Sequence, residues 1–369
     1  MIGADLSGAR PEMMANRGGV VAKVTLQDVA DAVGVSRMTV SNAFNRPHKL
    51  SQSLRATILE TATELGYGGP DPSARALARG RSGTVGLLLT DTLGEAFRDP
   101  VSTEFLVAIG DALAERSLAL TLVATAGDNP PLGKDLPMDG AIVYVCDPRV
   151  DLDWLRQRGT PVVTVDQTPT KGVPAVNVDD AGGARAGAEH LLELGHRRIG
   201  IVTVGQDLDG RIRPAGPPLA GWRKALAAAG VEPLVAHAGP HSVTAAYDAA
   251  KVLLARPDRP TGLLCFSDVF AAHAIRAAED LGLRVPEDLS VVGYDDADFA
   301  STFRPALTTI RQDVGAKGRA AVTALTALID GKAPKTRTVL RTELVIRDST
   351  AVAPPSSRQG SWPPDLVFG

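Results

Sequence analysis

The chain has 369 residues, with 39 Lys and Arg against 42 Asp and Glu, and a formal net charge of −3. This length exceeds what one small core organises and predicts two or three domains. The overall balance excludes a chain that is basic throughout. Residues 23–82, however, carry eight Lys and Arg against five Asp and Glu, whereas residues 83–369 have a net charge of −6. A small basic module on a larger acidic body favours nucleic-acid binding joined to a second task.

Neither a metal site nor a membrane segment is expected. Cys146 and Cys265 both lie in apolar runs and read as buried free thiols, which form neither a disulfide framework nor a metal cluster. The first residues lack a basic region followed by an apolar one, and no apolar run approaches the roughly 20 residues that span a bilayer. We expect a soluble, cytoplasmic protein with no cofactor and no membrane partner.

Both ends of the chain have the composition of unfolded segments. Residues 1–22 are rich in glycine and small residues without sustained periodicity, and they are expected to form a disordered extension. Residues 351–369 contain several prolines and serines and are expected to form a flexible tail.

Residues 23–70 predict three short helices. Thr25 is a good helix N-cap with Asp28 three residues later, and Gly34 suits the left-handed conformation that ends a helix. Ser36 caps a second helix, and Ser51 caps a third that extends toward Tyr67. Three short helices with a tight turn between the first two indicate a helix-turn-helix.

The second helix has the side chains of a recognition helix. Its first turn presents Arg37 and Met38, with Asn42 one turn later. Arg37 suits guanine N7 and O6, Asn42 suits adenine, and Met38 suits a thymine methyl group. The short donors and the lysine around this helix suit phosphate contacts: Ser36, Thr39, Ser41, Asn45, Lys49 and Ser51. Further candidate DNA-binding residues are Thr25, Tyr67 and Arg75. Any one of these residues is also explained as a cap or a solvated polar residue, but the combined pattern favours DNA binding.

From Thr84 onward, strands alternate with helices. Short runs rich in Val, Leu and Ile occur at residues 84–90, 119–125, 140–145, 161–166, 197–204, 262–268 and 289–296. Several are apolar throughout, as expected of parallel strands that are covered on both faces. Helical stretches separate them, including residues 104–117, 184–195, 219–230, 242–256 and 269–282. This alternation predicts parallel, doubly wound α/β sheets in two lobes.

The motifs of common enzymes do not match. Residues 127–135, "GDNPPLGKD", depart from a phosphate-binding loop in spacing, in Asp135 at the Ser/Thr position and in two prolines. Residues 182–187, "GGARAG", lack the dinucleotide-binding spacing, and no Gly-x-Ser-x-Gly nucleophile elbow occurs. His190, Glu193 and His196 are spaced at three residues, but Gly195 is expected to end the helix before His196, so ordinary surface polarity explains them.

Residues 24–67, "VTLQDVADAVGVSRMTVSNAFNRPHKLSQSLRATILETATELGY", closely resemble the DNA-binding headpiece of the LacI/GalR transcriptional regulators. The resemblance continues in "VNVDDAGGARAGAEHLLELGHRRIGIV", "LRVPEDLSVVGYDD", "PALTTIRQD" and "LVIRDST" and extends to about residue 350. It implies a hinge helix after the helix-turn-helix and a two-lobed core similar to periplasmic sugar-binding proteins. It also implies a homodimer that binds a palindromic operator in double-stranded DNA and responds to a small effector.

The resemblance implies boundaries as well. Residues 71–82 form the hinge helix, with Asp71 as its N-cap, Pro72 at its first position and Gly80 at its end. Residues 83–350 form the core, with lobe 1 at about 83–180 and 313–342 and lobe 2 at about 181–312 and 343–350. Leu77 falls where the family inserts a leucine into the minor groove, although the stretch from Tyr67 to Leu77 is one residue longer than usual.

The expected effector site lies in the cleft between the lobes, where parallel strands end. Polar candidates at strand ends or in the crossover are Asp91, Asp147, Asp268, Asp295 and Gln312, of which the last three match positions that often line the family's pocket. Aromatic side chains that can stack on a sugar or flat ring are Phe97, Trp222, Phe266 and Phe299.

One position departs from the sugar-responsive members of the family. Many of them carry an arginine four residues before the aromatic residue of "AGW", where Pro218 stands here. Arg211 or Arg213 is a candidate substitute; the alternatives are an effector other than a sugar, or a member that responds to no effector. The sequence therefore predicts a DNA-binding transcriptional regulator under effector control. A solute-binding protein and an α/β enzyme are the competing interpretations of the same core.

Overall fold

A computed structural model of the full chain describes residues 24–71, 76, 80–89, 92–124, 135–144, 153–205, 216–238 and 243–355, with the side chains of residues 216, 217 and 243 excepted. The chain divides into two compact units, residues 1–82 and 83–369. No helix among the described residues is long and apolar enough to cross a membrane.

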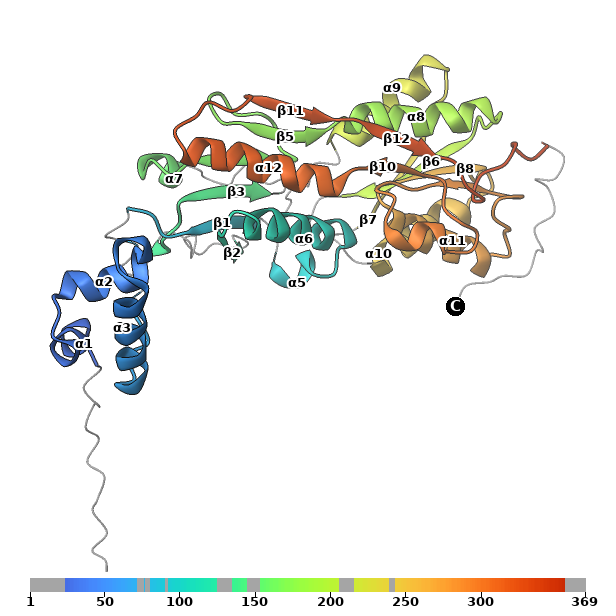
Figure 1. Ribbon diagram of the computed structural model, residues 1–369. Helices are drawn as coiled ribbons and strands as arrows, with labels where there is room; N and C mark the ends of the chain where they lie inside the picture. Colours follow the sequence, from blue (N-terminus) through green and yellow to red (C-terminus); the bar gives the residue numbers. More distant parts are fainter. Residues whose placement is uncertain are drawn as a thin grey trace, which may run out of the picture. The chain divides into compact units, whose positions relative to one another are not determined.

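The first unit contains three α-helices and a short 3-10 helix, which Figure 1 shows in blue: α1 (Leu26–Val33), α2 (Arg37–Asn45), η1 (Pro47–Lys49) and α3 (Gln52–Glu64). Each α-helix begins directly after a residue whose side chain accepts a hydrogen bond from its first turn, namely Thr25, Ser36 and Ser51. Gly34 ends α1 with φ 75°, in the left-handed region that glycine adopts without a steric penalty. The predicted helix-turn-helix is confirmed.

A small apolar core joins the three helices. Val29 and Ala30 of α1, Val40 of α2 and Ile58 of α3 are fully buried against one another. Leu65, which the apolar stripe of α3 was expected to include, lies just beyond the helix and is exposed. Burial of one face of α2 leaves its opposite face free of this core.

The second unit has the following helices: α5 (Leu93–Ala96), α6 (Pro100–Ala114), α7 (Asp153–Gln157), α8 (Asp180–Glu193), α9 (Gly216–Ala228), α10 (Val243–Leu254), α11 (Asp268–Asp280), η3 (Asp298–Ser301) and α12 (Val314–Ile329). Its strands are β1 (Thr84–Leu89), β2 (Ala119–Ala124), β3 (Gly140–Tyr144), β4 (Val162–Val165), β5 (Ala175–Val178), β6 (Ile199–Val204), β7 (Leu234–Ala238), β8 (Gly262–Cys265), β9 (Ser290–Val292), β10 (Thr309–Gln312), β11 (Arg337–Leu340) and β12 (Thr342–Val345).

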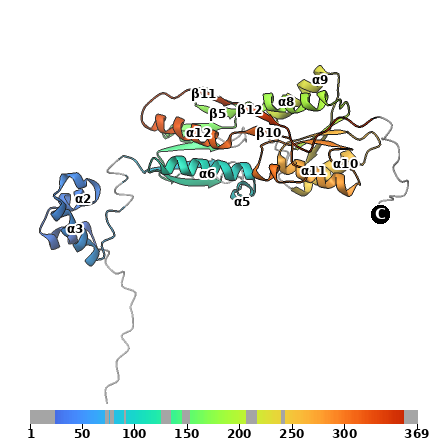
Figure 2. The same ribbon diagram turned by 45° about the vertical axis from the view of Figure 1, so that its right-hand side comes forward.

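Lobe 1 is built on a parallel sheet of order β11-β5-β4-β3-β1-β2. Alternate residues of β3 face opposite sides, because Ile142 packs with α6 and α12 whereas Val143 packs with Trp154 of α7. Figures 1 and 2 show α6 and α12 side by side on one face of this sheet. The apolar runs are therefore covered on both faces, as predicted.

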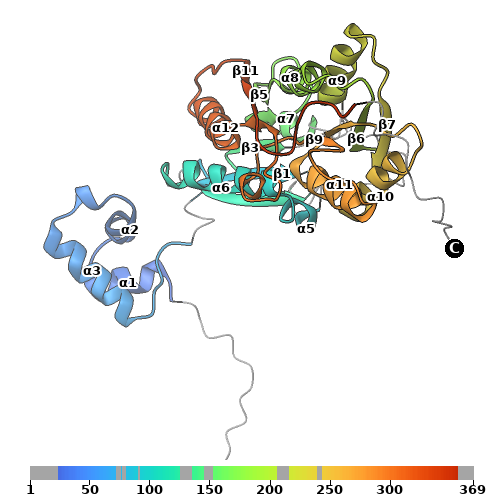
Figure 3. The ribbon, with the colours of Figure 1, turned by 90° about the vertical axis from the view of Figure 1, so that its right-hand side faces the viewer.

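Lobe 2 repeats this plan on a parallel sheet of order β7-β6-β8-β9. Ile201 of β6 packs in a cluster with α8 and α9, and Val202 packs in a second cluster with α10 and α11. Figure 3 shows these two helix pairs on opposite sides of the sheet. The two doubly wound parallel sheets agree with the predicted fold class.

Three crossover segments connect the lobes, at β5 to α8, β10 to α12 and β11 to β12. Two of them are joined directly: the Asp179 amide donates to the Leu340 carbonyl at 2.8 Å, and the Thr342 hydroxyl donates to the Asp179 carbonyl at 3.0 Å. Strands β10 and β12 pair antiparallel, which brings Gln312 of the second crossover opposite Thr342 of the third. The described crossovers thus form one joined hinge region between the lobes.

Candidate DNA-binding helix and inter-lobe site

The N-terminal turn of α2 presents the predicted base-reading side chains. Arg37 is exposed, and Met38 is 69% exposed, which is unusual for a large apolar side chain. Asn42, one turn later, is half-buried. Because Val40 and Ala43 of the same helix lie in the core, the helix is held by one face and offers the other. This is the arrangement that a helix needs to enter a major groove.

The capping serines retain a hydrogen for a second partner. Ser36 Oγ accepts from the Thr39 amide at 3.1 Å, and Ser51 Oγ accepts from the Leu54 amide at 3.3 Å. A hydroxyl that accepts from a backbone amide still has one proton to donate. Each serine also has a neighbouring hydroxyl, since Ser36 Oγ lies 2.9 Å from Thr39 Oγ1 and Ser51 Oγ lies 3.3 Å from Ser53 Oγ; in both pairs either hydroxyl is able to donate.

Thr25 differs from the capping serines because its hydroxyl is used on both sides. It accepts from the Asp28 amide at 3.4 Å and donates to Asp28 Oδ2 at 2.8 Å. The Thr25 amide and hydroxyl hydrogen bonds lower the pKa of the Asp28 carboxyl and keep it ionised. Thr25 therefore has a complete structural role in the capping box, and a phosphate contact by its hydroxyl requires breaking that box.

The remaining predicted DNA-contact residues vary in exposure. Lys49 in η1 is exposed, while Thr39, Ser41 and Asn45 are half-buried, and Asn45 Nδ2 donates to Ser41 Oγ at 3.4 Å. Tyr67 is half-buried with its ring edge-on to Phe44, and burial raises the pKa of its phenol. Arg75 and Leu77 lie outside the described residues.

Asp295 and Gln312 meet at the hinge region between the lobes. Gln312 Nε2 donates to Asp295 Oδ1 at 2.6 Å, and both residues are half-buried. Asp295 follows β9 of lobe 2, whereas Gln312 ends β10 at the second crossover. The structure thus brings together two of the three residues that the resemblance assigned to the pocket.

A lysine and an aspartate that sequence reasoning did not identify adjoin this pair. Lys317 Nζ donates to Gln312 Oε1 at 2.8 Å and lies 2.5 Å from Asp166 Oδ2. Lys317 is only 1% exposed although it is charged. No local pattern predicts this contact, since Asp166 and Lys317 are 151 positions apart and a lysine on an amphipathic helix usually faces solvent.

Carboxyl groups in this region are kept from ionising easily. Burial, together with the carboxylates of Asp268 and Asp99, raises the pKa of Asp295 well above its usual range. Burial and the Asp166 carboxylate raise the pKa of Asp180, whose carboxylate accepts from the Tyr294 hydroxyl, to about 6. A carboxyl that holds its proton offers both a donor and an acceptor, which suits ligands that carry hydroxyl groups.

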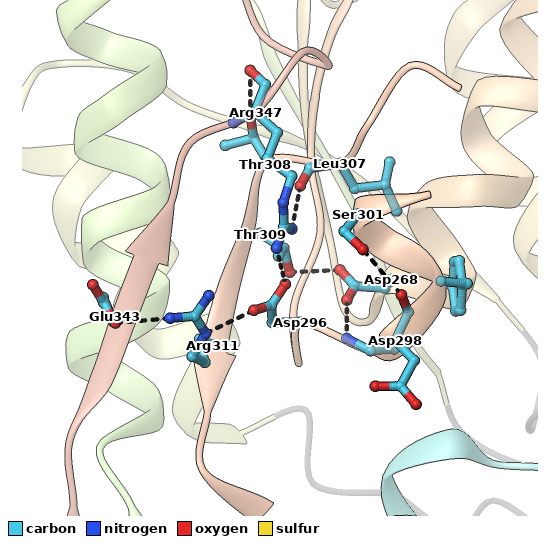
Figure 4. A network of polar contacts seen from close by, with 12 residues as sticks. Asp268, Asp296, Asp298, Ser301, Leu307, Thr308, Thr309, Arg311, Glu343 and Arg347 are labelled. Atoms are coloured by element: carbon cyan, nitrogen blue, oxygen red, sulfur yellow. Dashed lines mark hydrogen bonds and ion pairs between the residues drawn. The ribbon is translucent and has the colours of Figure 1, made fainter. Parts of the chain in front are cut away.

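Asp268 lies in the interior of lobe 2, which differs from its expected place in the pocket. It is 1% exposed; its Oδ1 accepts from Thr309 Oγ1 at 2.5 Å, and its Oδ2 accepts from the Ala297 amide at 2.8 Å (Figure 4). A Cβ on Gly293 would collide with Asp268 Oδ1, so glycine is required there. Both carboxylate oxygens are therefore committed to holding β10 and the segment after β9.

Next to Asp268, two arginines enclose Asp296 (Figure 4). Arg347 Nη2 lies 2.6 Å from Asp296 Oδ1, and Arg311 Nε lies 2.7 Å from Asp296 Oδ2. Arg311 also contacts Glu343 of β12 at 3.3 Å. These ion pairs fasten the segment after β9 to β10 and β12, and so position the neighbouring Asp295.

The predicted stacking aromatics do not share one environment. Trp222 is 1% exposed in the core between α8, α9 and the sheet, so in this structure it offers no ring face to a ligand, contrary to expectation. Phe266 and Phe299 are half-buried against the lobe 2 core, and each packs on another phenylalanine. Phe97 is 55% exposed after α5. Only these last three rings retain any accessible surface.

Several candidate positions lie outside the described residues, namely Asp91, Asp147, Cys146, Arg211, Arg213 and residues 1–22. Pro218 is buried in the first turns of α9, and Cys265 is a buried thiol whose pKa burial raises. Within the described part of the chain, no group of three or more His, Cys, Asp or Glu side chains is arranged to hold a metal ion.

Comparison with known proteins agrees with both units. Residues 25–69 match the model of bacterial regulatory proteins of the lacI family, and residues 188–350 match a periplasmic binding protein-like domain. An HTH-type transcriptional regulator of Mycolicibacterium smegmatis is 36% identical over 332 residues, which cover 81% of this chain and 89% of that protein.

Solved structures give the same result. The Lac repressor dimer bound to operator and the anti-inducer ONPF is similar with a TM-score of 0.76 at 27% identity, covering 89% of this chain and 99% of that one. The complex of the transcriptional regulator CelR with cellobiose is similar with a TM-score of 0.63 at 29% identity, covering 88% of this chain and 99% of the other. The chain belongs to the LacI family of bacterial regulatory proteins and is a DNA-binding transcriptional regulator.

Proposed function

We propose that the protein is a cytoplasmic, homodimeric repressor that binds a palindromic operator and is controlled by a small molecule bound between its lobes. The observation that carries the DNA half of this proposal is α2, which buries Val40 and Ala43 and exposes Arg37 and Met38. The similar Lac repressor structure, a dimer bound to operator, supports the same arrangement for this chain.

Within this proposal the DNA contacts divide into two kinds. Arg37, Met38 and Asn42 read base edges in the major groove, and Arg37 does so through a bidentate contact to guanine. Phosphate contacts come from Lys49 and from hydroxyl and amide groups around α2, with the Ser36 and Ser51 hydroxyls favoured over that of Thr25 because Thr25 already serves Asp28. Residues 71–82 supply a hinge helix whose Leu77 enters the minor groove, with Arg75 on the adjoining phosphates.

For the effector, we propose that Asp295 and Gln312 provide the polar contacts and that Phe97, Phe266 and Phe299 provide apolar ones. The carboxyl–amide pair lies at the hinge, where the two lobes have to move relative to one another. Asp147 and either Arg211 or Arg213 complete the proposed pocket. The similar CelR structure holds cellobiose, which supports a sugar or another hydroxyl-rich metabolite as the ligand class.

Control follows from a population shift. A ligand changes operator affinity only to the extent that it binds one arrangement of the lobes more tightly than the other, typically by about 1–3 kcal/mol. The proposal assigns the chain a binding role and no catalytic step. Residues that contact the ligand should therefore be separable from those that contact DNA.

Fluorescence anisotropy with labelled duplex DNA tests this proposal against the two rivals. A regulator that neutralises several phosphates loses affinity steeply with salt, with a slope of roughly −0.9 per phosphate contact on a log–log plot. A solute-binding protein or an enzyme on this core should show almost no binding. With a ligand identified by thermal shift against a sugar panel, Asp295→Ala should abolish the ligand's effect on operator affinity, while the ligand-free variant still binds operator DNA.

A further inference from the structure

We propose that Lys317 is a positioning residue, which orients the side-chain amide of Gln312 toward Asp295 and thereby joins lobe 1 to lobe 2. The orientation itself follows from contacts within the core unit. Its consequence for DNA binding rests on the function proposed above. Lys317 and Asp166 thereby become part of the inter-lobe site.

The ammonium of Lys317 contacts two hydrogen-bond acceptors and two aromatic rings. It lies 2.5 Å from Asp166 Oδ2 and 2.8 Å from Gln312 Oε1, and it is 5.8 Å from the ring centroids of both Phe105 and Tyr144. An ammonium has three donors and no acceptor, and the aromatic faces attract its remaining charge. Two of the three Lys317 donors are thus used within the protein, and the ammonium is 1% exposed, so it is placed to hold Gln312 and not to meet solvent.

The hydrogen bond from Lys317 dictates which way the Gln312 amide points. Lysine can only donate, so the group of Gln312 that faces it must be the carbonyl oxygen Oε1. The Nε2 amino group is then directed to the other side, where it donates to Asp295 Oδ1 at 2.6 Å. Without the ammonium the amide is free to turn over, because its oxygen and nitrogen ends have the same shape.

The four residues that these contacts link, from Asp166 through Lys317 and Gln312 to Asp295, come from both lobes. Asp166 follows β4, and Lys317 lies in α12, which packs on the lobe 1 sheet. Asp295 follows β9 of lobe 2. The contacts therefore run from the ion pair in lobe 1 through Gln312 at the crossover to a carboxyl of lobe 2.

The backbone at both ends of this chain of contacts is unusual. Asp166 has φ 53° and Asp295 has φ 108°, both in the region that residues other than glycine rarely adopt. Such conformations persist where the surroundings hold them, and they cluster at functional sites. The side-chain contacts of Asp166 and Asp295 help to hold these two positions, together with hydrogen bonds from their backbone amides to the carbonyls of neighbouring strands.

The energetic cost of the ion pair also favours a positioning role. Burial of a charge in a region next to Phe105 and Tyr144 is unfavourable, and apolar residues of similar volume often replace a buried ion pair without loss of stability. Stability alone therefore does not account for Lys317. The orientation of Gln312 is a property that an apolar residue at this position would not provide.

Nuclear magnetic resonance of the full-length protein with 15N-labelled glutamine tests the orientation directly. The chain contains seven glutamines, and Gln312→Leu identifies the side-chain amide signal of Gln312 by its loss. In the wild-type protein this signal should be protected from hydrogen exchange. Lys317→Met should shift it and speed its exchange by about tenfold or more, whereas Lys317→Arg, which keeps the charge, should largely preserve it.

Two further variants control for general effects of the substitution. Lys332→Met removes a lysine that is exposed just after α12 and should leave the Gln312 signal unchanged. Should Lys317→Met fail to fold, the double variant Lys317→Met with Asp166→Leu removes both charges, and removal of both partners is better tolerated than removal of one. A folded variant without the ammonium whose Gln312 signal keeps its position and protection would overturn the orientation.

Operator affinity of the same proteins tests the link between the lobes. Lys317→Met should change the affinity of the ligand-free protein by about fivefold or more, the lower range of typical allosteric coupling. Lys317→Arg and Lys332→Met should match the wild type. A moved Gln312 signal with unchanged operator affinity would overturn the link alone, whereas absence of DNA binding by the wild type would contradict the proposed function instead.

Discussion

Asp268 Oδ1 accepts a hydrogen bond from Thr309 Oγ1 at 2.5 Å, in a position where the aspartate is 1% exposed. This contact connects the start of α11 in lobe 2 to β10, whose other end carries Gln312. Asp268 thereby supports the inter-lobe site from inside the lobe. Burial raises the pKa of the Asp268 carboxyl to about 7, although its hydrogen bonds to Thr309 and Ala297 oppose the rise.

The raised pKa of Asp268 predicts a fall in stability between about pH 4 and pH 7. Over this range the folded protein holds a proton that the unfolded chain has released, so the free energy of unfolding decreases as pH rises. Asp180, with a pKa of about 6, contributes in the same direction. In Asp268→Asn the fall should be shallower, since the amide does not ionise. Urea unfolding between pH 4.5 and pH 8 measures this, and parallel pH profiles for the two proteins would contradict it.

For His196 we expect the opposite pH dependence, in which stability falls as pH is lowered. Its Nδ1 lies 2.9 Å from Thr261 Oγ1, and its Nε2 lies 3.0 Å from Ser290 Oγ and 3.1 Å from the Ala351 carbonyl. Burial lowers the pKa of this imidazole below 6.5, so the stability that the neutral ring provides is lost as pH falls below that value. His196→Ala leaves these partners unsatisfied and should lower the free energy of unfolding by about 2 kcal/mol or more.

The control for His196 is His237→Ala, because His237 is exposed on β7. Chemical denaturation at pH 7.5 should show a large decrease in the free energy of unfolding of His196→Ala relative to the wild type. At pH 5.5 this decrease should be smaller. The effect of His237→Ala should be within about 0.5 kcal/mol at both values. Equal losses for the two variants would exclude the proposed structural role of His196.

Arg37 and Lys49 provide a matched pair for the DNA contacts, since both are exposed cations in the helix-turn-helix. Arg37→Ala should cost roughly 1–3 kcal/mol on the operator and relax preference at one base pair. Lys49→Ala should weaken binding to all sequences alike and reduce the salt slope by about one. Anisotropy titrations on operator and scrambled duplexes separate the two. A uniform loss for Arg37→Ala would instead make Arg37 a phosphate contact.

Ile58→Ala tests whether the small core of the first unit is what presents α2. Ile58 is fully buried against Val29, Ala30 and Val40, so its truncation should cost about 2–5 kcal/mol of that unit's stability. Operator binding should fall sharply at 37 °C, while the unfolding transition of the core unit stays where it is. If calorimetry showed the unfolding transition of the core unit shifted as much as that of the first unit, the prediction would be wrong. Thr57→Ala, at an exposed neighbouring position, is the control.

Local signals made the helix-turn-helix predictable. The caps Thr25, Ser36 and Ser51 and the glycine at position 34 mark helix ends through interactions over three or four residues, and the structure starts its helices at those positions. The strands that lie in continuous apolar runs were equally clear, because burial on two faces leaves few polar residues. Strands β5, β7, β10, β11 and β12 were not identified, since each has only four or five residues and includes polar or charged side chains.

The inter-lobe site was predictable only in part. Asp295 and Gln312 were found through the family resemblance, and the structure brings them into contact. The burial of Trp222 and Asp268 was not foreseen, because a residue near the end of a strand or the start of a helix faces either the cleft or the core with the same local sequence. Lys317 and Asp166 are paired by tertiary structure alone, which no local pattern records.

Recognition of a palindromic operator through α2 is tested by selecting bound sequences from a random duplex library with the purified full-length protein. We expect an enriched palindrome, in keeping with a dimer that uses one α2 helix on each half-site. The same selection with Arg37→Ala should lose the preference at one symmetric pair of positions and retain the rest. Sequences enriched without twofold symmetry, or no enrichment with or without added metabolites, would contradict recognition of a palindromic operator through α2.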